Sequence, residues 1–249
     1  MVRIAEIESG SIADDLHLEI GTRIVRINGK RIRDGIDLTF LLANTALELE
    51  TVTPGGEEIL YEIEREPGES VGIVPAADSI RECGNKCVFC FIDGNPKDVR
   101  DSLWLRDDDF RLSFTYGNYV TLTNVGPRGM DRLVEQRISP LYVSVHATDP
   151  DVRVRLLVND RAGLIMDQLG YLIENNLEVH TQVVLCPEWN DGPHLDRTME
   201  DLYRLGEDVI SLSVVPVGLT KYNKGRPVRP ITPAEARIAI RQVDRMRGK

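Results

Sequence analysis

The chain has 249 residues, of which 42% are hydrophobic and 28% charged, and this composition excludes a disordered or fibrous protein. Its formal charge of −10 predicts that nucleic acid is not a partner, because most of the surface would repel phosphates. The first residues do not resemble a signal peptide and no apolar run reaches membrane-spanning length. We therefore expect a cytoplasmic protein with no membrane partner, in which the 4 cysteines are ligands or buried thiols rather than disulfides.

Residues 1–74 are predicted to form a small β-rich domain. Arg23–Ile27 is predicted to be a strand, closed by the turn dipeptide Asn28-Gly29. Apolar and polar residues alternate over 47–52 and again over 59–64, on either side of a Pro-Gly-Gly turn. This pattern predicts a β-hairpin.

Two segments of this domain, residues 7–13 (IESGSIA) and 21–29 (GTRIVRING), resemble the bacterial PDZ domain. The resemblance implies that the domain captures the tail of another protein. In PDZ domains the strand that captures the peptide normally precedes this point, and residues 71–73 could supply it in a permuted order. The alternative is that the domain only packs on its neighbour, since a fold does not by itself give a function.

From residue 75 onward, strands alternate with helices. Strands are predicted before Cys83 and at residues 119–123, 141–146, 178–185 and 209–217. Repeated βα units imply a parallel sheet or barrel, in which ligands lie at the carboxyl ends of the strands. The last helix is predicted to begin at the capping box Thr232-Pro233-Ala234-Glu235.

No strand follows that helix in the sequence. We therefore expect residues 75–249 to form a partial (β/α) barrel of roughly five parallel strands, truncated before its last strand. The predicted fold class is thus α/β, with the small β-rich domain preceding the barrel.

Three cysteines, Cys83, Cys87 and Cys90, are separated by three and then by two residues. A loop this compact can hold one face of a 4Fe-4S cluster through three thiolates, which leaves the fourth iron free. A structural zinc site normally needs a fourth ligand, and no other Cys or His is near in sequence. Cys186 is more often a buried thiol than a ligand, and three unrelated core thiols are the other alternative.

The cysteine spacing, together with Phe89 before the third cysteine, resembles the radical SAM superfamily. The resemblance implies an oxidoreductase-like enzyme with a 4Fe-4S cluster and S-adenosylmethionine (SAM) as cofactors. Such an enzyme cleaves SAM reductively to a 5′-deoxyadenosyl radical, which abstracts hydrogen from a substrate that remains unknown. It also implies that Phe89 packs near the adenine and that ferredoxin or flavodoxin supplies the electron.

A closer resemblance covers nearly the whole chain. It is to a family of predicted iron–sulfur oxidoreductases that join an N-terminal PDZ-like domain to a radical SAM domain, usually followed by a C-terminal domain that is missing here. Gly94-Asn95-Pro96 departs from that family's pattern. The resemblance rests on residues 87–93, 107–114, 121–124, 139–148 and 215–222.

Five further positions are candidates for cofactor binding. Thr123 and Asn124 follow the second predicted strand, where many radical SAM proteins bind the methionine amino group. Ser144 and His146 share one face of a predicted strand, and Gln182 lies on the next strand, so all three could reach ribose or substrate. The alternative for His146 and Gln182 is a hydrogen-bonded polar core. No catalytic residue can be named from the sequence.

Two functions are open at this point. The first is the radical SAM enzyme just described. The second is an iron–sulfur binding module that recognises a protein tail through the PDZ-like domain and carries a structural or redox-sensing cluster. The cysteine spacing, which leaves an iron free, favours the enzyme, and a missing last strand favours the module.

Overall fold

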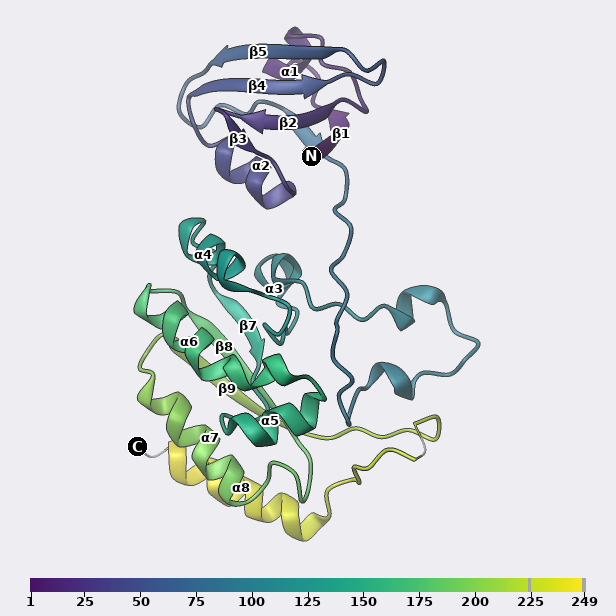
Figure 1. Cartoon of the computed structure of the whole chain (residues 1–249), viewed down its shortest axis with the longest axis vertical. Helices are drawn as coiled ribbons and strands as arrows, with labels where there is room; N and C mark the ends of the chain where they lie inside the picture. Colours follow the sequence, from purple (N-terminus) through teal and green to yellow (C-terminus); the bar gives the residue numbers. More distant parts are fainter. Residues whose placement is uncertain (224, 248–249) are drawn as a thin grey trace. The chain divides into compact units, whose positions relative to one another are not determined.

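The computed structural model describes residues 1–223 and 225–247. The chain divides into two compact units, Met1–Ser79 and Ile80–Lys249. Figure 1 shows the order of the elements along the chain. The boundary lies slightly beyond the predicted one at residues 74/75, because Pro75 pairs with Ile4 in the sheet of the first unit.

The first unit is built on an antiparallel sheet, which confirms the β-rich fold predicted for it. The strand order is β5-β4-β2-β1-β6, and β3 pairs with β2. Buried Ile24, Ile27 and Leu49 contribute to a core that the helices α1 and α2 help to enclose. The elements are β1 (Val2–Ile7), α1 (Ile12–Asp15), β2 (Arg23–Ile27), β3 (Lys30–Arg31), α2 (Gly35–Leu41), β4 (Ala46–Val52), β5 (Glu58–Glu64) and β6 (Ile73–Pro75).

Both turns predicted in this unit are confirmed. Asn28 and Gly29 have φ angles of 50° and 72° and join β2 to β3, as expected of an Asn-Gly hairpin turn. Strands β4 and β5 pair along their whole length in the predicted hairpin. Gly72 has a φ of +80°, and a Cβ there would lie 2.1 Å from Ser11 Oγ, so only glycine fits where the chain enters β6.

The second unit contains a three-stranded parallel sheet in the order β7-β8-β9. Its strands are β7 (Leu141–Ser144), β8 (Val179–Leu185) and β9 (Val209–Pro216). The helices are α3 (Phe110–Tyr116), α4 (Pro127–Glu135), α5 (Pro150–Leu157), α6 (Ile165–Glu174), α7 (Pro193–Arg204) and α8 (Pro233–Arg247), with short 3-10 turns η1 (Ile92–Gly94), η2 (Asp101–Trp104) and η3 (Asp160–Leu164).

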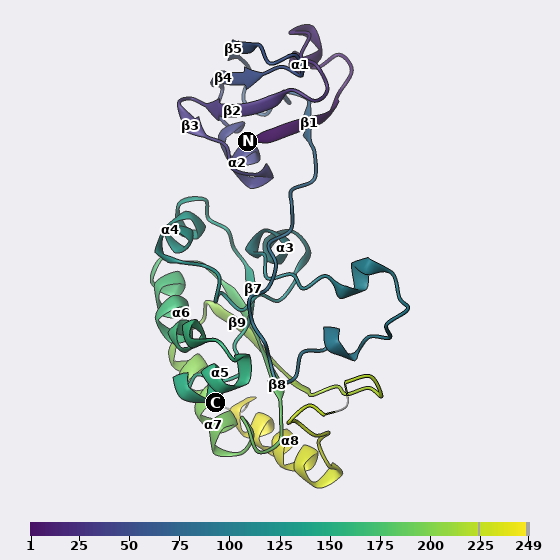
Figure 2. The same ribbon diagram turned by 45° about the vertical axis from the view of Figure 1, so that its right-hand side comes forward.

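The two faces of this sheet differ. Along β8, Val179, Thr181, Val183 and Leu185 are buried, whereas the residues between them are only partly buried. The helices α5, α6 and α7 cover one face, and the segment that carries the cysteines lies on the other side (Figure 2). The face opposite these three helices is therefore the one that carries the candidate site.

The prediction of about five parallel strands is wrong, because the strand expected at residues 119–123 is reduced to a single parallel bridge between Val120 and Val143. The next ladder bond would join the Leu122 N–H to the Ser144 carbonyl, but that carbonyl accepts from Arg153 Nη2 instead. The Thr121 backbone groups face away from β7, where the N–H donates to Asp108 Oδ1 and the carbonyl accepts from Arg153 Nη2. Leu122 then adopts a φ of +61°, which ends the extended conformation.

The strand expected before Cys83 also differs from the prediction. Residues 73–75 pair with β1 in the first unit. Further on, Glu82 forms an isolated antiparallel bridge with Asp107, flanked by hydrogen bonds from Cys83 N to Arg106 O and from Asp108 N to Arg81 O. The approach to the cysteines is thus held by the 106–108 segment and not by the parallel sheet.

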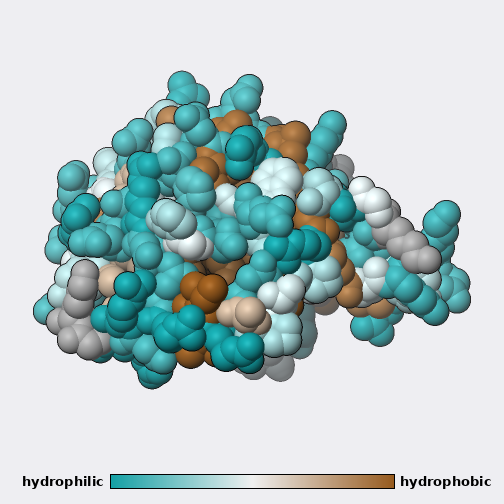
Figure 3. Space-filling model, turned by 90° about the horizontal axis from the view of Figure 1, so that it is seen from below, coloured by the Kyte–Doolittle hydropathy of each residue, from teal (hydrophilic) through white to brown (hydrophobic). Residues whose placement is uncertain are grey.

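The capping box at the start of α8 is confirmed. Thr232 Oγ1 accepts from Glu235 N (3.3 Å), and Glu235 Oε2 accepts from Thr232 N (2.8 Å). Figure 3 shows that the surface at this end of the second unit is largely hydrophilic, with small separate hydrophobic patches. Within residues 1–223 and 225–247, every helix is too short or too polar to cross a membrane.

Candidate functional site

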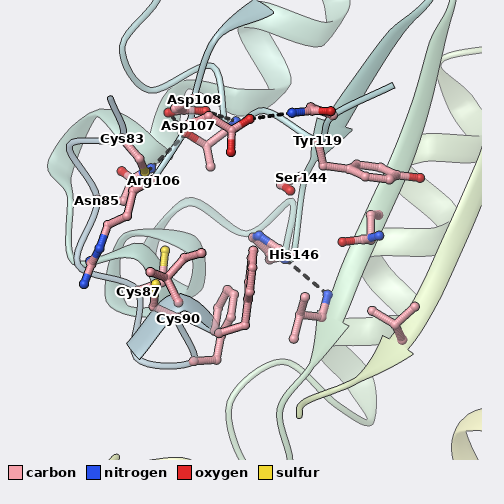
Figure 4. Close-up of a pocket in the computed structure, with 18 of the residues that line it drawn as sticks. Cys83, Asn85, Cys87, Cys90, Arg106, Asp107, Asp108, Tyr119, Ser144 and His146 are labelled. Atoms are coloured by element: carbon pink, nitrogen blue, oxygen red, sulfur yellow. Dashed lines mark hydrogen bonds between the residues drawn. The ribbon is translucent and has the colours of Figure 1, made fainter. Parts of the chain in front are cut away.

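A cavity of about 500 Å³ opens at the carboxyl ends of the parallel strands. Cys83, Cys87 and Cys90 form one wall of it. Figure 4 shows the cysteines together on one side, with Ser144 and His146 facing them from the end of β7 and from the residues just after it. This is the location that parallel sheets use for ligands.

The cysteine loop is held in place by the end of α5. The N–H groups of Lys86 and Val88 donate to the carbonyls of Leu157 (3.0 Å) and Leu156 (2.9 Å). The last carbonyls of a helix have no N–H partner within the helix. The cysteine loop supplies the missing N–H groups, and these hydrogen bonds fix the path of the loop. Packing adds to this, because Val88 and Phe89 share a core cluster with Leu156 and Leu157.

The three cysteines fit a 4Fe-4S cluster. All three are partly buried and line one cavity, and Cys87 and Cys90 lie side by side in Figure 4. In the described part of the chain, no three His, Cys, Asp or Glu side chains converge on a single metal ion. A cubane cluster does not require such convergence, because each thiolate binds a different iron.

Burial affects the protonation of these thiols. It raises the pKa of Cys87 to about 12, with further contributions from Cys83 and Cys90, and it also raises the pKa of Cys83. Without a metal both groups are therefore neutral thiols near pH 7, and binding of a cluster must release their protons.

Cys186 does not line the cavity. It is completely buried in the core cluster that contains Phe89, its backbone N–H donates to Asn190 Oδ1, and its Sγ donates weakly to Val184 O at 3.7 Å. Burial raises the pKa of this thiol to about 12 as well. The structure thus places Cys186 in the core and not on the cavity wall.

Four of the six predicted cofactor-binding residues line the cavity: Phe89, Ser144, His146 and Gln182. Ser144 and Gln182 are directly opposite each other in the β7–β8 register, which explains why they project from the same face. Thr123 and Asn124 do not line it. Thr123 is buried and donates to Asn85 Oδ1, and Asn124 donates to the Asp108 carbonyl.

His146 is held in one orientation. Its φ is +63°, its Nδ1 accepts from Val184 N at 3.1 Å, and its ring meets Phe89 edge-on at 4.7 Å. Burial, and after it the charge of Arg153, lowers the pKa of His146 to about 3, so the imidazole is neutral. Because Nδ1 accepts, the proton is assigned to Nε2, and Figure 4 shows the other ring nitrogen turned toward the cavity.

Two residues of the acidic run Asp107-Asp108-Asp109 are buried, since Asp108 and Asp109 are each 1% exposed. Asp107 accepts from Asn118 Nδ2, and Asp108 accepts from both the backbone and the hydroxyl of Thr121 (2.6 Å each). Burial raises the pKa of Asp108. Asp109 caps α3 and binds Arg111. The run therefore ties the cysteine-side segment to the strand ends.

Arg153 is a functional-site residue that the sequence did not reveal. It is 0% exposed and donates only to backbone carbonyls, those of Thr121, Ser144, Val145 and Ala162, at 2.6–2.9 Å. Burial lowers its pKa to about 9, which still leaves it charged near pH 7. It joins α5 to the strand ends beneath the cavity. An arginine in a helix of mixed polarity carries no signal of such burial.

Asn85 and Thr121 also line the cavity and were not predicted. Asn85 lies inside the cysteine motif and Thr121 stands two residues before the predicted Thr123. Their closeness in sequence to the predicted residues is the feature that could have indicated them. Neither spacing nor residue type distinguished Thr121 from Thr123, because the positive φ of Leu122 decides which side chain faces the cavity.

Comparison with known families identifies the chain. The model of the family described as "Radical SAM-like domain" matches residues 65–212, which is more than half of the sequence. The chain belongs to the radical SAM-like domain family. The match begins within the first unit and extends into β9 of the second.

Two solved structures are similar to this radical SAM-like protein. One is a domain of pyruvate-formate lyase-activating enzyme from Bacteroides vulgatus ATCC 8482, with 14% identity, a TM-score of 0.41 and coverage of 51% of this chain and 75% of that one. The other is a radical SAM methyltransferase from Sphaerobacter thermophilus, with 17% identity, a TM-score of 0.39 and coverage of 90% and 74%. Comparison with curated proteins found no match.

Proposed function

We propose that this radical SAM-like protein is an enzyme that cleaves SAM reductively, with a 4Fe-4S cluster held by Cys83, Cys87 and Cys90. The observation that carries the proposal is the position of three thiols on one wall of a cavity at the strand ends. Held by these thiolates, a cluster would supply the one electron that converts SAM to methionine and a 5′-deoxyadenosyl radical, and the radical would take a hydrogen atom from the substrate.

The chain's own residues bind and orient the ligands in this proposal. Phe89 lines the cavity beside the cysteines and packs near the adenine. The Nε2–H of His146 donates to the ligand, and Ser144 and Gln182 present polar groups to its ribose from adjacent strands. We assign contact with the methionine amino group to Thr121 in place of Thr123 and Asn124, because Thr121 lines the cavity.

The space beside the cysteines favours the enzyme over the iron–sulfur binding module, because a structural cluster needs no adjoining cavity. We further propose that the electron comes from a ferredoxin or flavodoxin. The closer family, iron–sulfur oxidoreductases with an N-terminal PDZ-like domain, remains a proposal. So does capture of a protein tail by residues 1–74.

The direct test is formation of 5′-deoxyadenosine. The protein is reconstituted anaerobically with iron and sulfide, reduced with dithionite and incubated with SAM. We expect 5′-deoxyadenosine from the wild type and none above background from Cys90→Ala. A wild type that carries the cluster but forms no 5′-deoxyadenosine would refute the proposed reaction.

A further inference from the structure

We propose that Asn85 is a positioning residue that raises the reduction potential of the cluster by donating a hydrogen bond to the sulfur of Cys83. The inference rests on the proposed function only in requiring a cluster at the three cysteines. It adds to that function a residue that controls how readily the cluster accepts its electron.

The side chain of Asn85 is 4% exposed and all of its polar capacity is used. Its Nδ2 lies 3.3 Å from Cys83 Sγ and 2.9 Å from Thr121 Oγ1. Its Oδ1 accepts from Thr123 Oγ1 at 3.0 Å and from Asn159 Nδ2 at 2.7 Å. The amide is therefore placed by contacts on both sides.

The orientation of the Asn85 amide follows from Asn159. Asn159 Oδ1 accepts from the backbone N–H of Arg161 at 3.0 Å, so Asn159 must turn its NH2 toward Asn85. An NH2 group cannot accept, so the atom of Asn85 that it meets is the oxygen. The NH2 group of Asn85 therefore faces the sulfur of Cys83.

Asn159 is itself held by the end of α5. It follows Leu157, whose carbonyl binds the cysteine loop, and Val158, which has a φ of 52°. A β-branched residue in the left-handed region is strained and persists only where its surroundings require it. The same helix end thus anchors the loop and aims the amide at Cys83.

The sign of the effect follows from charge. A hydrogen bond to a ligand sulfur stabilises the reduced cluster more than the oxidised one, because the reduced cluster has the additional electron. Asn85 is such a donor, because its Nδ2 lies 3.3 Å from Cys83 Sγ.

The test measures the midpoint potential of the reconstituted full chain without SAM, by EPR at a series of set potentials. Asn85→Leu removes the donor and should give a lower potential than wild type. Asn85→Asp keeps the acceptor for Asn159 and Thr123 but places an oxygen near Cys83, so it should lower the potential further. Asn159→Leu keeps the Asn85 donor but removes a hydrogen bond that orients it. We therefore expect a smaller fall in the midpoint potential.

Asn118→Leu is the matched control. Asn118 lines the same cavity and donates to Asp107 Oδ2 at 2.8 Å, without a hydrogen bond to any cysteine. The midpoint potential of the cluster in Asn118→Leu should equal that of the wild type.

The outcomes are distinct. Asn85→Leu and Asn85→Asp clusters with wild-type potentials would overturn the inference, and so would failure of both variants to bind a cluster that Asn118→Leu binds. A wild type that binds no cluster would instead refute the proposed function.

Discussion

Arg153 shows how a single buried cation supports the site. Its guanidinium donates to four backbone carbonyls, and the opposite charge with the largest effect on its pKa is Asp108. A charge buried in this way is costly to remove, because the acceptors around it lose their hydrogen bonds. We expect Arg153→Met to lower the free energy of unfolding by about 3 kcal/mol or more.

The measurement is urea denaturation followed by tryptophan fluorescence, since Trp104 and Trp189 both lie in the second unit. Arg155→Met is the control, because Arg155 lies two residues away on the same helix, is exposed, and stacks over Trp189 at 5.5 Å. Its effect should stay below about 1 kcal/mol. Equal effects of the two substitutions would refute the role given to Arg153.

His146 makes a prediction about pH. The unfolded chain protonates this histidine below its ordinary pKa of about 6.5, whereas the folded chain resists protonation until about pH 3. Between these values the unfolded state binds more protons, so stability falls as the pH falls. This contribution is absent in His146→Asn. Near pH 5 the free energy of unfolding of the variant should therefore depend on pH less steeply than that of the wild type, and the two slopes should differ by about 1.4 kcal/mol per pH unit.

Asparagine suits this position, because it tolerates a positive φ and its Oδ1 can accept from Val184 N as the ring does. The slope is obtained from urea denaturation of the cluster-free protein between pH 4 and 7. His194→Asn is the control, since His194 is only partly buried in the same unit. Identical slopes for wild type and His146→Asn would contradict the neutral, buried imidazole.

At the scale of elements, the end of α5 stores strain. Val158 is 52% exposed and has a φ of 52°, so its side chain gains little from burial to offset the unfavourable backbone. Val158→Gly should raise the free energy of unfolding by about 1 kcal/mol. Val154→Gly in the body of the same helix should lower it by a similar amount. Destabilisation by Val158→Gly in the same denaturation measurement would show that Val158 is not strained.

The sequence predicted the elements whose signals are local. The hairpin turn at Asn28-Gly29, the β4–β5 hairpin and the capping box of α8 all depend on residues adjacent in the chain, and all are confirmed. The strand predicted at 119–123 is cut short because Arg153, distant in sequence, donates to the Ser144 carbonyl that the next ladder bond would use. Periodicity does not report such competition.

The residues of the candidate site likewise fall into those with a local sequence signal and those placed by distant residues. The cysteines and the alternating Ser144 and Gln182 follow from spacing and strand period, and they share a cavity. Asn85, Thr121 and Arg153 depend on hydrogen bonds between segments far apart in the chain. The sequence therefore predicted the residues that share the cavity through local signals, but not those that depend on contacts between distant segments.

At the scale of the whole molecule, the two units have separate cores. Leu49→Ala, in the first, and Leu169→Ala, in the second, each remove a side chain that is 0% exposed and should cost about 2–5 kcal/mol. Tryptophan fluorescence reports on the second unit, which holds Trp104 and Trp189, so it should detect only the loss of stability in Leu169→Ala. Far-UV circular dichroism should detect the loss of stability in both variants. A common shift of both signals in Leu49→Ala would mean that the units unfold as one.

The central claim is that three cysteines hold one cluster and leave one iron open. Iron and sulfide per chain, measured after anaerobic reconstitution, test it most directly. We expect Cys83→Ala, Cys87→Ala and Cys90→Ala each to lose most of the iron and Cys186→Ala to retain the wild-type amount. Iron that depends on Cys186 as strongly as on the other three would contradict the claim.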